Sequence, residues 1–202
     1  TDIDIAREKN LQGQIDNMLL HQSISAIHKD IRQGRKRSYM LNMEEGTLKD
    51  IDFMEELFHV LEQDEELASR LIFEITQSTL QEMKQQNLSV LSSLAKLGCG
   101  VSMDQVDDPH LDRQFMRDIG VQYIKVSGDR LKTFSETDEG VTVMRRIKNA
   151  LAEDGISIIS DKVEDERTVC EVLDLEIDYG QGYLFGKPDR KSVYDNLRRK
   201  AR

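Results

Sequence analysis

The sequence predicts an α/β fold, a (β/α)8-type barrel in which parallel strands lie inside and helices lie outside. Short β-branched or apolar runs alternate with longer segments of helical apolar spacing along the whole 202-residue chain. In addition, six successive predicted strands end in a polar or ionisable residue, and barrel enzymes place their chemistry at such strand ends. These residues are Asn42, Glu74, Asp104, Lys125, Asp161 and Gln181.

The first half of the chain predicts three strands separated by helices. Apolar residues from Leu11 to Ile31 lie on one helical stripe, so a helix is expected over 11–33, ending at Gly34. A strand over 39–43, a helix over 52–63 and a strand over 71–75 follow. Ser78 with Gln81 resembles a capping box that opens one helix running to Gly98. The third strand is expected over 100–104.

The second half continues the alternation. A short helix over 111–119, a strand over 123–126 and a helix over 141–154 are expected. The run 156–159 is β-branched between a glycine and an aspartate, which predicts a buried strand. A helix over 164–175 and a second short strand then lead to a glycine-rich aromatic loop over 178–186, and a polar helix is expected over 191–202.

The glycine-rich loop and the end of the strand before it are the most informative stretch. Three glycines surround Gln181, Tyr183 and Phe185, and glycine permits close backbone approach to a ligand while aromatic rings offer flat faces. The alternative is an ordinary tight turn, with Gln181 bonding its own backbone. Asp161 likewise fits either a strand-end site or, with Glu164, a helix N-cap.

Charge and composition narrow the function classes. The net charge of -10 argues against a general binder of nucleic acid polymers, which needs a basic face, but allows one small anionic ligand. Cys99 and Cys170 lack metal or redox spacing, which favours a reduced cytoplasmic setting, and the histidines show no metal-ligand spacing. No membrane segment is visible, and residues 1–202 are expected to form a single domain.

The polar strand ends suggest chemistry at oxygen ligands. Glu74 and Asp104 are carboxylates on neighbouring strands and Asn42 adds an amide oxygen, a set that suits Mg²⁺ or Ca²⁺. Lys125 would hold a phosphate oxygen or orient water. Such a site fits phosphodiester chemistry, and it fits an enolising barrel enzyme equally well.

At this point the chain resembles the EAL domain family, the barrel family of cyclic-di-GMP phosphodiesterases. Seven segments resemble family motifs, and they occur in the family's order. They are 6–11 with Ile15-Asp16 after the signature strand, Leu41-Asn42, Phe73-Glu74-Ile75-Thr76, Leu97-Gly98 with Met103-Asp104-Gln105, Ile124-Lys125-Val126, Ser160-Asp161-Lys162-Val163-Glu164 for Ala-Glu-Gly-Val-Glu, and Gln181-Gly182-Tyr183-Leu184-Phe185 for Gln-Gly-Tyr. The sequence of residues 102–106 and 124–126 is most similar to a degenerate, TipF-like branch of this family, which is associated with flagella and motility.

The departures from the family pattern imply a damaged metal site. The family's signature Glu-Ala-Leu strand has no counterpart in this sequence, so we expect one metal-ligand glutamate to be missing and the domain to be N-terminally incomplete. Gln105 replaces the second aspartate of an Asp-Asp pair, and 106–109 replace the loop that follows it. Asp161 is one methylene shorter than the family's glutamate. An upstream strand is therefore expected to close the barrel and raise stability without restoring catalysis.

The resemblance implies a catalytically inactive receptor for cyclic di-GMP that signals through protein partners. Its ligand-binding residues would be Gln181, Tyr183, Phe185, Pro188, Lys125, Asp161 and Glu164, and an incomplete Mg²⁺ site would comprise Asn42, Glu74 and Asp104. A weak metal-dependent phosphodiesterase and a protein-interaction module that has lost the nucleotide remain alternatives. The carboxylates of this pocket repel a dianionic ligand unless a metal or Lys125 offsets their charge. If neither does, the protein-interaction module is the favoured hypothesis.

Overall fold

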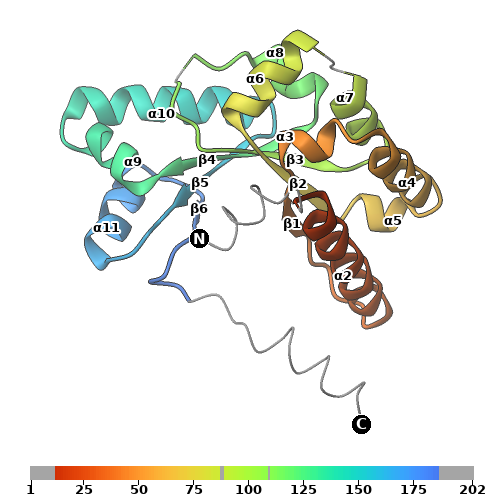
Figure 1. Ribbon diagram of the computed structural model, residues 1–202. Helices are drawn as coiled ribbons and strands as arrows, with labels where there is room; N and C mark the ends of the chain where they lie inside the picture. Colours follow the sequence, from red (N-terminus) through yellow and green to blue (C-terminus); the bar gives the residue numbers. More distant parts are fainter. Residues whose placement is uncertain (1–11, 87–88, 109, 187–202) are drawn as a thin grey trace. The chain divides into compact units, whose positions relative to one another are not determined.

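The computed structural model describes residues 12–86, 89–108 and 110–186. Strands and helices alternate along them as predicted, which confirms the α/β class (Figure 1). The chain divides into two compact units. The first holds the chain up to Lys125 together with Ala150–Ser157, and the second holds Val126–Asn149 and the chain from Ile158 onward. No helix within the described ranges combines the length and the apolar character needed to cross a bilayer.

The first unit contains parallel strands that pair in chain order, β1 with β2, β2 with β3 and β3 with β4. The carboxyl ends of these strands therefore lie at one edge of the sheet, as the barrel prediction required. The elements in chain order are α2 (Gln12–Arg32), β1 (Tyr39–Asn42), α3 (Glu45–Leu48), α4 (Ile51–Glu62), α5 (Glu65–Ala68), β2 (Leu71–Thr76), α6 (Gln77–Gln86), α7 (Ser89–Lys96), β3 (Gly100–Asp104), α8 (Arg113–Asp118) and β4 (Val121–Ser127), whose last two residues belong to the second unit.

The core of the first unit forms around β2 and β3. Leu71, Phe73 and Ile75 of β2 are fully buried and point to one face of the sheet, and Val101 on β3, opposite Phe73, is fully buried as well. Apolar side chains of α4, α6 and α7 complete this core. They are Phe53, Met54, Leu57, Leu61, Leu80, Met83, Leu91 and Leu94.

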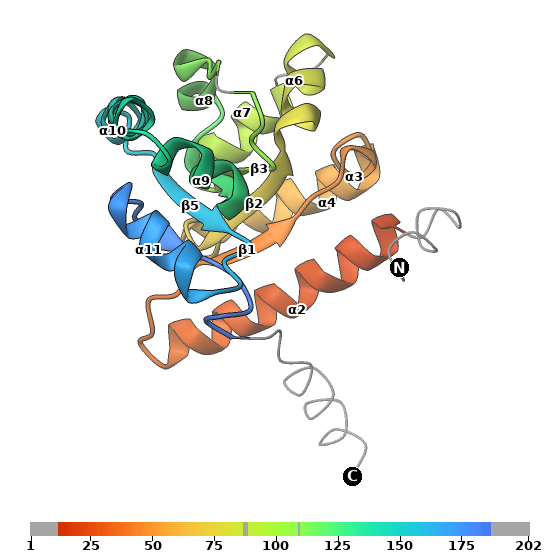
Figure 2. The same cartoon turned by 90° about the vertical axis from the view of Figure 1, so that its left-hand side faces the viewer.

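One buried carboxylate, Asp30, links the end of α2 to the start of β1. Figure 2 shows α2 running below β1. Asp30 accepts hydrogen bonds from the Tyr39 hydroxyl at 3.0 Å and from Arg35 at 3.2 Å, and Arg37 lies 3.7 Å away. Burial alone would raise the pKa of Asp30, but the Tyr39 hydrogen bond and the two guanidinium groups hold that pKa below its ordinary value. Two of the basic residues after Gly34 therefore neutralise Asp30.

The second unit is built on one strand pair and the helices beside it. Its elements are α9 (Gly128–Ser135), α10 (Asp138–Glu153), β5 (Ser157–Asp161), α11 (Glu166–Asp174) and β6 (Tyr179–Gly180), with the last four residues of α10 and the first residue of β5 in the first unit. β5 pairs with β6 in parallel, with Ile159 opposite Tyr179 and Ser160 opposite Gly180. Helix α11 packs on α9 (Figure 1).

Most predicted boundaries agree with the structure, and the differences have local causes. The single helix expected from Ser78 to Gly98 is found as α6 and α7, on either side of residues 87–88, which lie outside the described residues. The capping box at Ser78 is wrong, because α6 begins one residue earlier and the Thr76 hydroxyl accepts the Thr79 N–H at 3.2 Å. The short helices α3 and α5 and the two-turn helix α9 were not predicted, since such short segments carry little periodicity.

Candidate functional site

The first unit places Asn42, Glu74 and Asp104 on one face of the sheet at its carboxyl edge. Asn42 lies opposite Glu74, and Glu74 lies opposite Ser102 on β3. Ser102 and Asp104 are two residues apart on one strand, so their side chains leave the same face. The strand register therefore places the three residues that were predicted as metal ligands on one face, and we refer to them as the strand-end group.

A buried ion pair dominates this group. The Lys125 Nζ lies 2.7 Å from Glu74 Oε1, and the two side chains are only 5% and 12% exposed. A buried ammonium group requires a counter-charge, because removing that ion from water without one costs roughly several kcal/mol. Glu74 supplies that counter-charge from β2, across the intervening strand β3. Lys125 thus lies beside the predicted metal ligands, as expected, but it is bound to one of them.

This arrangement does not fit a divalent metal ion. A metal at Glu74 would compete with the Lys125 ammonium for the same carboxylate and would be repelled by it. Among the residues that the structure describes, no three His, Cys, Asp or Glu side chains are grouped so that they could hold a metal. Gln105, which follows Asp104, is exposed and neutral. We therefore derive no chemical step through a metal.

Two residues near the strand-end group were not predicted from the sequence. Gln77, only 6% exposed, accepts the Asp107 and Asp108 N–H groups at 2.9 Å each and donates to the Asp108 carbonyl at 2.9 Å. It thereby fixes the loop after β3. The Ser102 hydroxyl is buried and has no hydrogen-bond partner within the described residues. The alternation Ser102-Met103-Asp104 was the available signal, because it puts Ser102 on the face of Asp104.

In the second unit, Asp161 ends β5 as predicted and is not a helix cap. Helix α11 is capped instead by Asp165, which accepts the Thr168 N–H at 2.8 Å. That backbone hydrogen bond lowers the pKa of Asp165 below its ordinary value. The alternative in which Asp161 and Glu164 form a capping pair is therefore wrong. Asp161 is half-buried and Glu164 is exposed.

The glycine-rich loop is bound to the end of β5 through its backbone. The Gln181 N–H donates to the Ser160 carbonyl at 2.7 Å, the Val163 N–H donates to the Gln181 carbonyl at 2.9 Å, and the Leu184 N–H donates to the Val163 carbonyl at 3.2 Å. A Cβ at Gly182 would lie 2.1 Å from the Val163 carbonyl oxygen, so only glycine fits. At Gly182, the close approach that glycine permits is an approach to the Val163 backbone.

The loop leaves its predicted ligand side chains accessible. Tyr183 and Phe185 are each 60% exposed. The Gln181 side chain is exposed and makes no hydrogen bond within the described residues, so the alternative in which its amide bonds its own turn is wrong. Pro188, the remaining predicted loop residue, lies outside the described residues.

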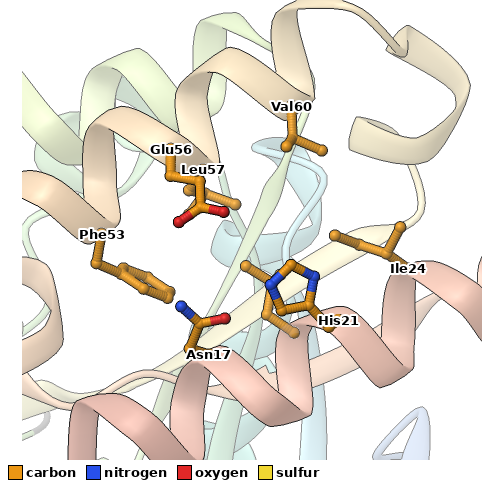
Figure 3. A pocket seen from close by; sticks show the side chains of 8 residues that line it. Asn17, His21, Ile24, Phe53, Glu56, Leu57 and Val60 are labelled. Carbon is orange, nitrogen blue, oxygen red and sulfur yellow. The ribbon is translucent and has the colours of Figure 1, made fainter.

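The hollows detected in the first unit lie away from the strand-end group. Figure 3 shows a small gap between α2 and α4, with Asn17 and His21 on one helix and Phe53 and Glu56 on the other. Another hollow, of about 380 Å³, is lined mainly by apolar side chains of α3, α4, α6 and α7. Neither is lined by a predicted site residue.

We expect Gly182→Ala to detach the loop from β5 because the added methyl group overlaps Val163. Hydrogen exchange measured by NMR should show the Val163 and Leu184 amides losing at least about tenfold protection. Gly186→Ala is the matched control, since a Cβ there meets nothing within 4 Å. Equal protection in the two variants would contradict the close approach at Gly182.

We expect Lys125→Met to lower the free energy of unfolding by about 3–5 kcal/mol, because Glu74 would be left buried without its counter-charge. The double variant Glu74→Leu/Lys125→Met should recover about half of that loss or more. Lys49→Met, which breaks the exposed ion pair with Glu45, is the control and should change stability little. Urea denaturation measures all three, and a neutral Lys125→Met would refute the importance of the pair.

Comparison with curated proteins finds cyclic di-GMP phosphodiesterases. The chain is 21% identical over 180 residues to PdeA of Borreliella burgdorferi, covering 89% of this chain and 27% of that protein. It is 24% identical over 187 residues to PdeF of Escherichia coli, covering 92% of this chain and 25% of that protein. The chain thus spans about a quarter of the length of these relatives.

Solved structures show the same fold. The PaMucR phosphodiesterase in complex with c-di-GMP matches with a TM-score of 0.77 at 18% identity, over 95% of this chain and 78% of that chain. The FimX EAL domain of Xanthomonas citri in complex with c-diGMP matches with a TM-score of 0.74 at 19% identity, over 91% of this chain and 73% of that chain.

The family assignment rests on the match over nearly the whole sequence. The EAL domain family matches residues 3–188, which include every strand and helix described above. The parallel strand order, the polar strand ends and the glycine-rich loop after β6 agree with that match. This chain belongs to the EAL domain family.

Proposed function

We propose that this chain binds cyclic di-GMP without hydrolysing it and acts as a receptor that signals through protein partners. The observation that carries the proposal is the pairing of Glu74 with Lys125 at 2.7 Å. That pairing commits a carboxylate of the predicted metal set to an internal ammonium group. Meanwhile the loop that would contact the nucleotide keeps its side chains exposed.

The chemistry of the loop suits a guanine dinucleotide. Tyr183 and Phe185 offer exposed ring faces, and base–aromatic stacking contributes about 1–3 kcal/mol per base. The unpaired amide of Gln181 offers both a donor and an acceptor to a base edge or a phosphate oxygen. PaMucR and the Xanthomonas citri FimX EAL domain, whose fold this chain shares, are both described in complex with cyclic di-GMP.

The absence of turnover is inferred from the strand-end group. A two-metal phosphodiester hydrolysis uses carboxylates to hold ions that activate water and stabilise the leaving oxygen. Here Glu74 is neutralised by Lys125, and Gln105 is neutral where the family motif has a second aspartate. Asn42 and Asp104 alone make a poor cage for a divalent ion.

Two other functions remain distinguishable. Curated relatives named as cyclic di-GMP phosphodiesterases favour a weak hydrolase, which would require a metal to displace Lys125 from Glu74. The carboxylates Asp161 and Glu164 favour a protein-interaction module that has lost the nucleotide. We also propose that the chain belongs to the degenerate TipF-like branch, because residues 102–106 and 124–126 resemble it. We propose that the chain forms the (β/α)8 barrel of the family. A cytoplasmic location is proposed as well, because a reducing setting suits the free thiols of Cys99 and Cys170.

We expect cyclic di-GMP incubated with the protein and Mg²⁺ or Mn²⁺ to remain cyclic, because the carboxylates needed for two metals are not available. Chromatography of the mixture measures any linear dinucleotide. A family member with a complete metal set, assayed in parallel, shows that the conditions support turnover. Linear product at an enzyme-like rate would establish the hydrolase instead.

We expect Gln181→Ala and Tyr183→Ala each to weaken cyclic di-GMP binding by about 1–3 kcal/mol, since each removes a direct contact. Asp104→Ala should weaken it less, because Asp104 could contribute only through a metal, which the Lys125–Glu74 pair disfavours. Calorimetric titration measures the affinities, and circular dichroism confirms that each variant is folded. The ordering would be contradicted if Asp104→Ala abolished binding while both loop variants bound normally.

A further inference from the structure

Lys162 has a backbone conformation that favours glycine. Its φ is 59°, in the left-handed region that a lysine rarely adopts, and the family motif quoted above has glycine at this position. A non-glycine residue persists in this region only where its surroundings impose it, and such residues gather at binding sites. Lys162 directly follows Asp161 at the carboxyl end of β5.

A comparison within the same unit shows what is unusual about Lys162. Glu176 also has a positive φ, 56°, but it lies just past the end of α11, where helices commonly end in this conformation. The Glu176 side chain, in addition, pairs with Arg145 at 3.4 Å. Lys162 is at no helix end. Its exposed ammonium group makes no hydrogen bond or ion pair within the described residues.

The backbone around Lys162 is fixed on both sides by the glycine-rich loop. Ser160 accepts the Gln181 N–H, and Val163 donates to the Gln181 carbonyl. Lys162 therefore lies between the points at which the loop is bound to the strand end, so its position relative to Gln181 is set by hydrogen bonds of 2.7 and 2.9 Å. This geometry places a cation beside the loop proposed to bind the nucleotide.

Charge gives that cation a function. Asp161 and Glu164 lie within two residues of Lys162 in the chain, and both would repel a ligand with two phosphodiester charges. An uncommitted lysine at the strand end offsets the local carboxylates and provides donors for a phosphate oxygen.

We propose that Lys162 is a ligand-binding residue whose ammonium group contacts a phosphodiester oxygen of the dinucleotide, which makes binding in this chain independent of a metal at the strand-end group. This inference rests on the proposed function and adds to it the residue that accommodates the ligand's charge. The left-handed backbone is retained because the lysine improves binding at a cost in stability.

Three variants separate charge from backbone strain. Lys162→Arg keeps the charge, Lys162→Asn removes the charge but tolerates the left-handed region, and Lys162→Gly removes both the charge and the strain. The matched control is Lys36→Asn, which removes one exposed positive charge from the loop before β1. Each is titrated calorimetrically with cyclic di-GMP in chelator at low and at high salt, and each is melted.

We expect Lys162→Asn and Lys162→Gly to bind about fivefold more weakly than the unaltered chain at low salt, with a smaller loss at high salt. Lys162→Arg and Lys36→Asn should bind within about twofold of it. Lys162→Gly should melt at or above the temperature of the unaltered chain, so that affinity and stability change in opposite directions.

The outcomes distinguish this inference from the proposed function. If the unaltered chain binds cyclic di-GMP and all Lys162 variants bind equally well, the contact is refuted while the receptor function stands. If Lys162→Gly loses both affinity and stability, the lysine is structural and the inference is equally refuted. If the unaltered chain binds no cyclic di-GMP, the proposed function fails and the role of Lys162 fails with it.

Discussion

The ion pair between Lys125 and Glu74 is the constraint on which the chemistry of the strand-end group depends. The sheet register puts Asn42, Glu74 and Asp104 on one face, and that arrangement alone would suit an oxygen-liganded metal. The buried ammonium changes the outcome, because it satisfies Glu74 and opposes a second cation at the same carboxylate. A sheet that could position a metal therefore positions a salt bridge, and the proposed loss of catalysis follows from this exchange.

The loop of the second unit depends on a different physical factor, the close approach of two backbone segments. Gly182 allows the chain to pass against Val163, and three backbone hydrogen bonds then fix the loop without using any of its side chains. Gln181, Tyr183 and Phe185 consequently remain exposed and available. The strain at Lys162 is maintained by the same hydrogen bonds, which is why a lysine can persist where the backbone favours glycine.

Sequence reasoning located the strand ends because a polar residue after a buried run is a strong local signal. Asn42, Glu74, Asp104, Lys125 and Asp161 each lie in a strand at the predicted place. The partners of these residues could not be predicted, because strand register and side-chain reach decide them, as the Lys125 contact across β3 shows. The helix N-caps were predicted at the wrong residues for a similar reason. The observed caps, Thr76 and Asp165, lie within a few residues of the equally plausible Ser78 and Asp161. Gln77 gave no periodic signal and was missed.

The most direct test of the central claim, that an internal ammonium group takes the place of a metal in this chain, is a calorimetric titration with cyclic di-GMP in chelator and in excess Mg²⁺. The account predicts the same dissociation constant in both buffers, within about twofold, because the ligand contacts the loop and lysine side chains. Binding that required Mg²⁺ would contradict it.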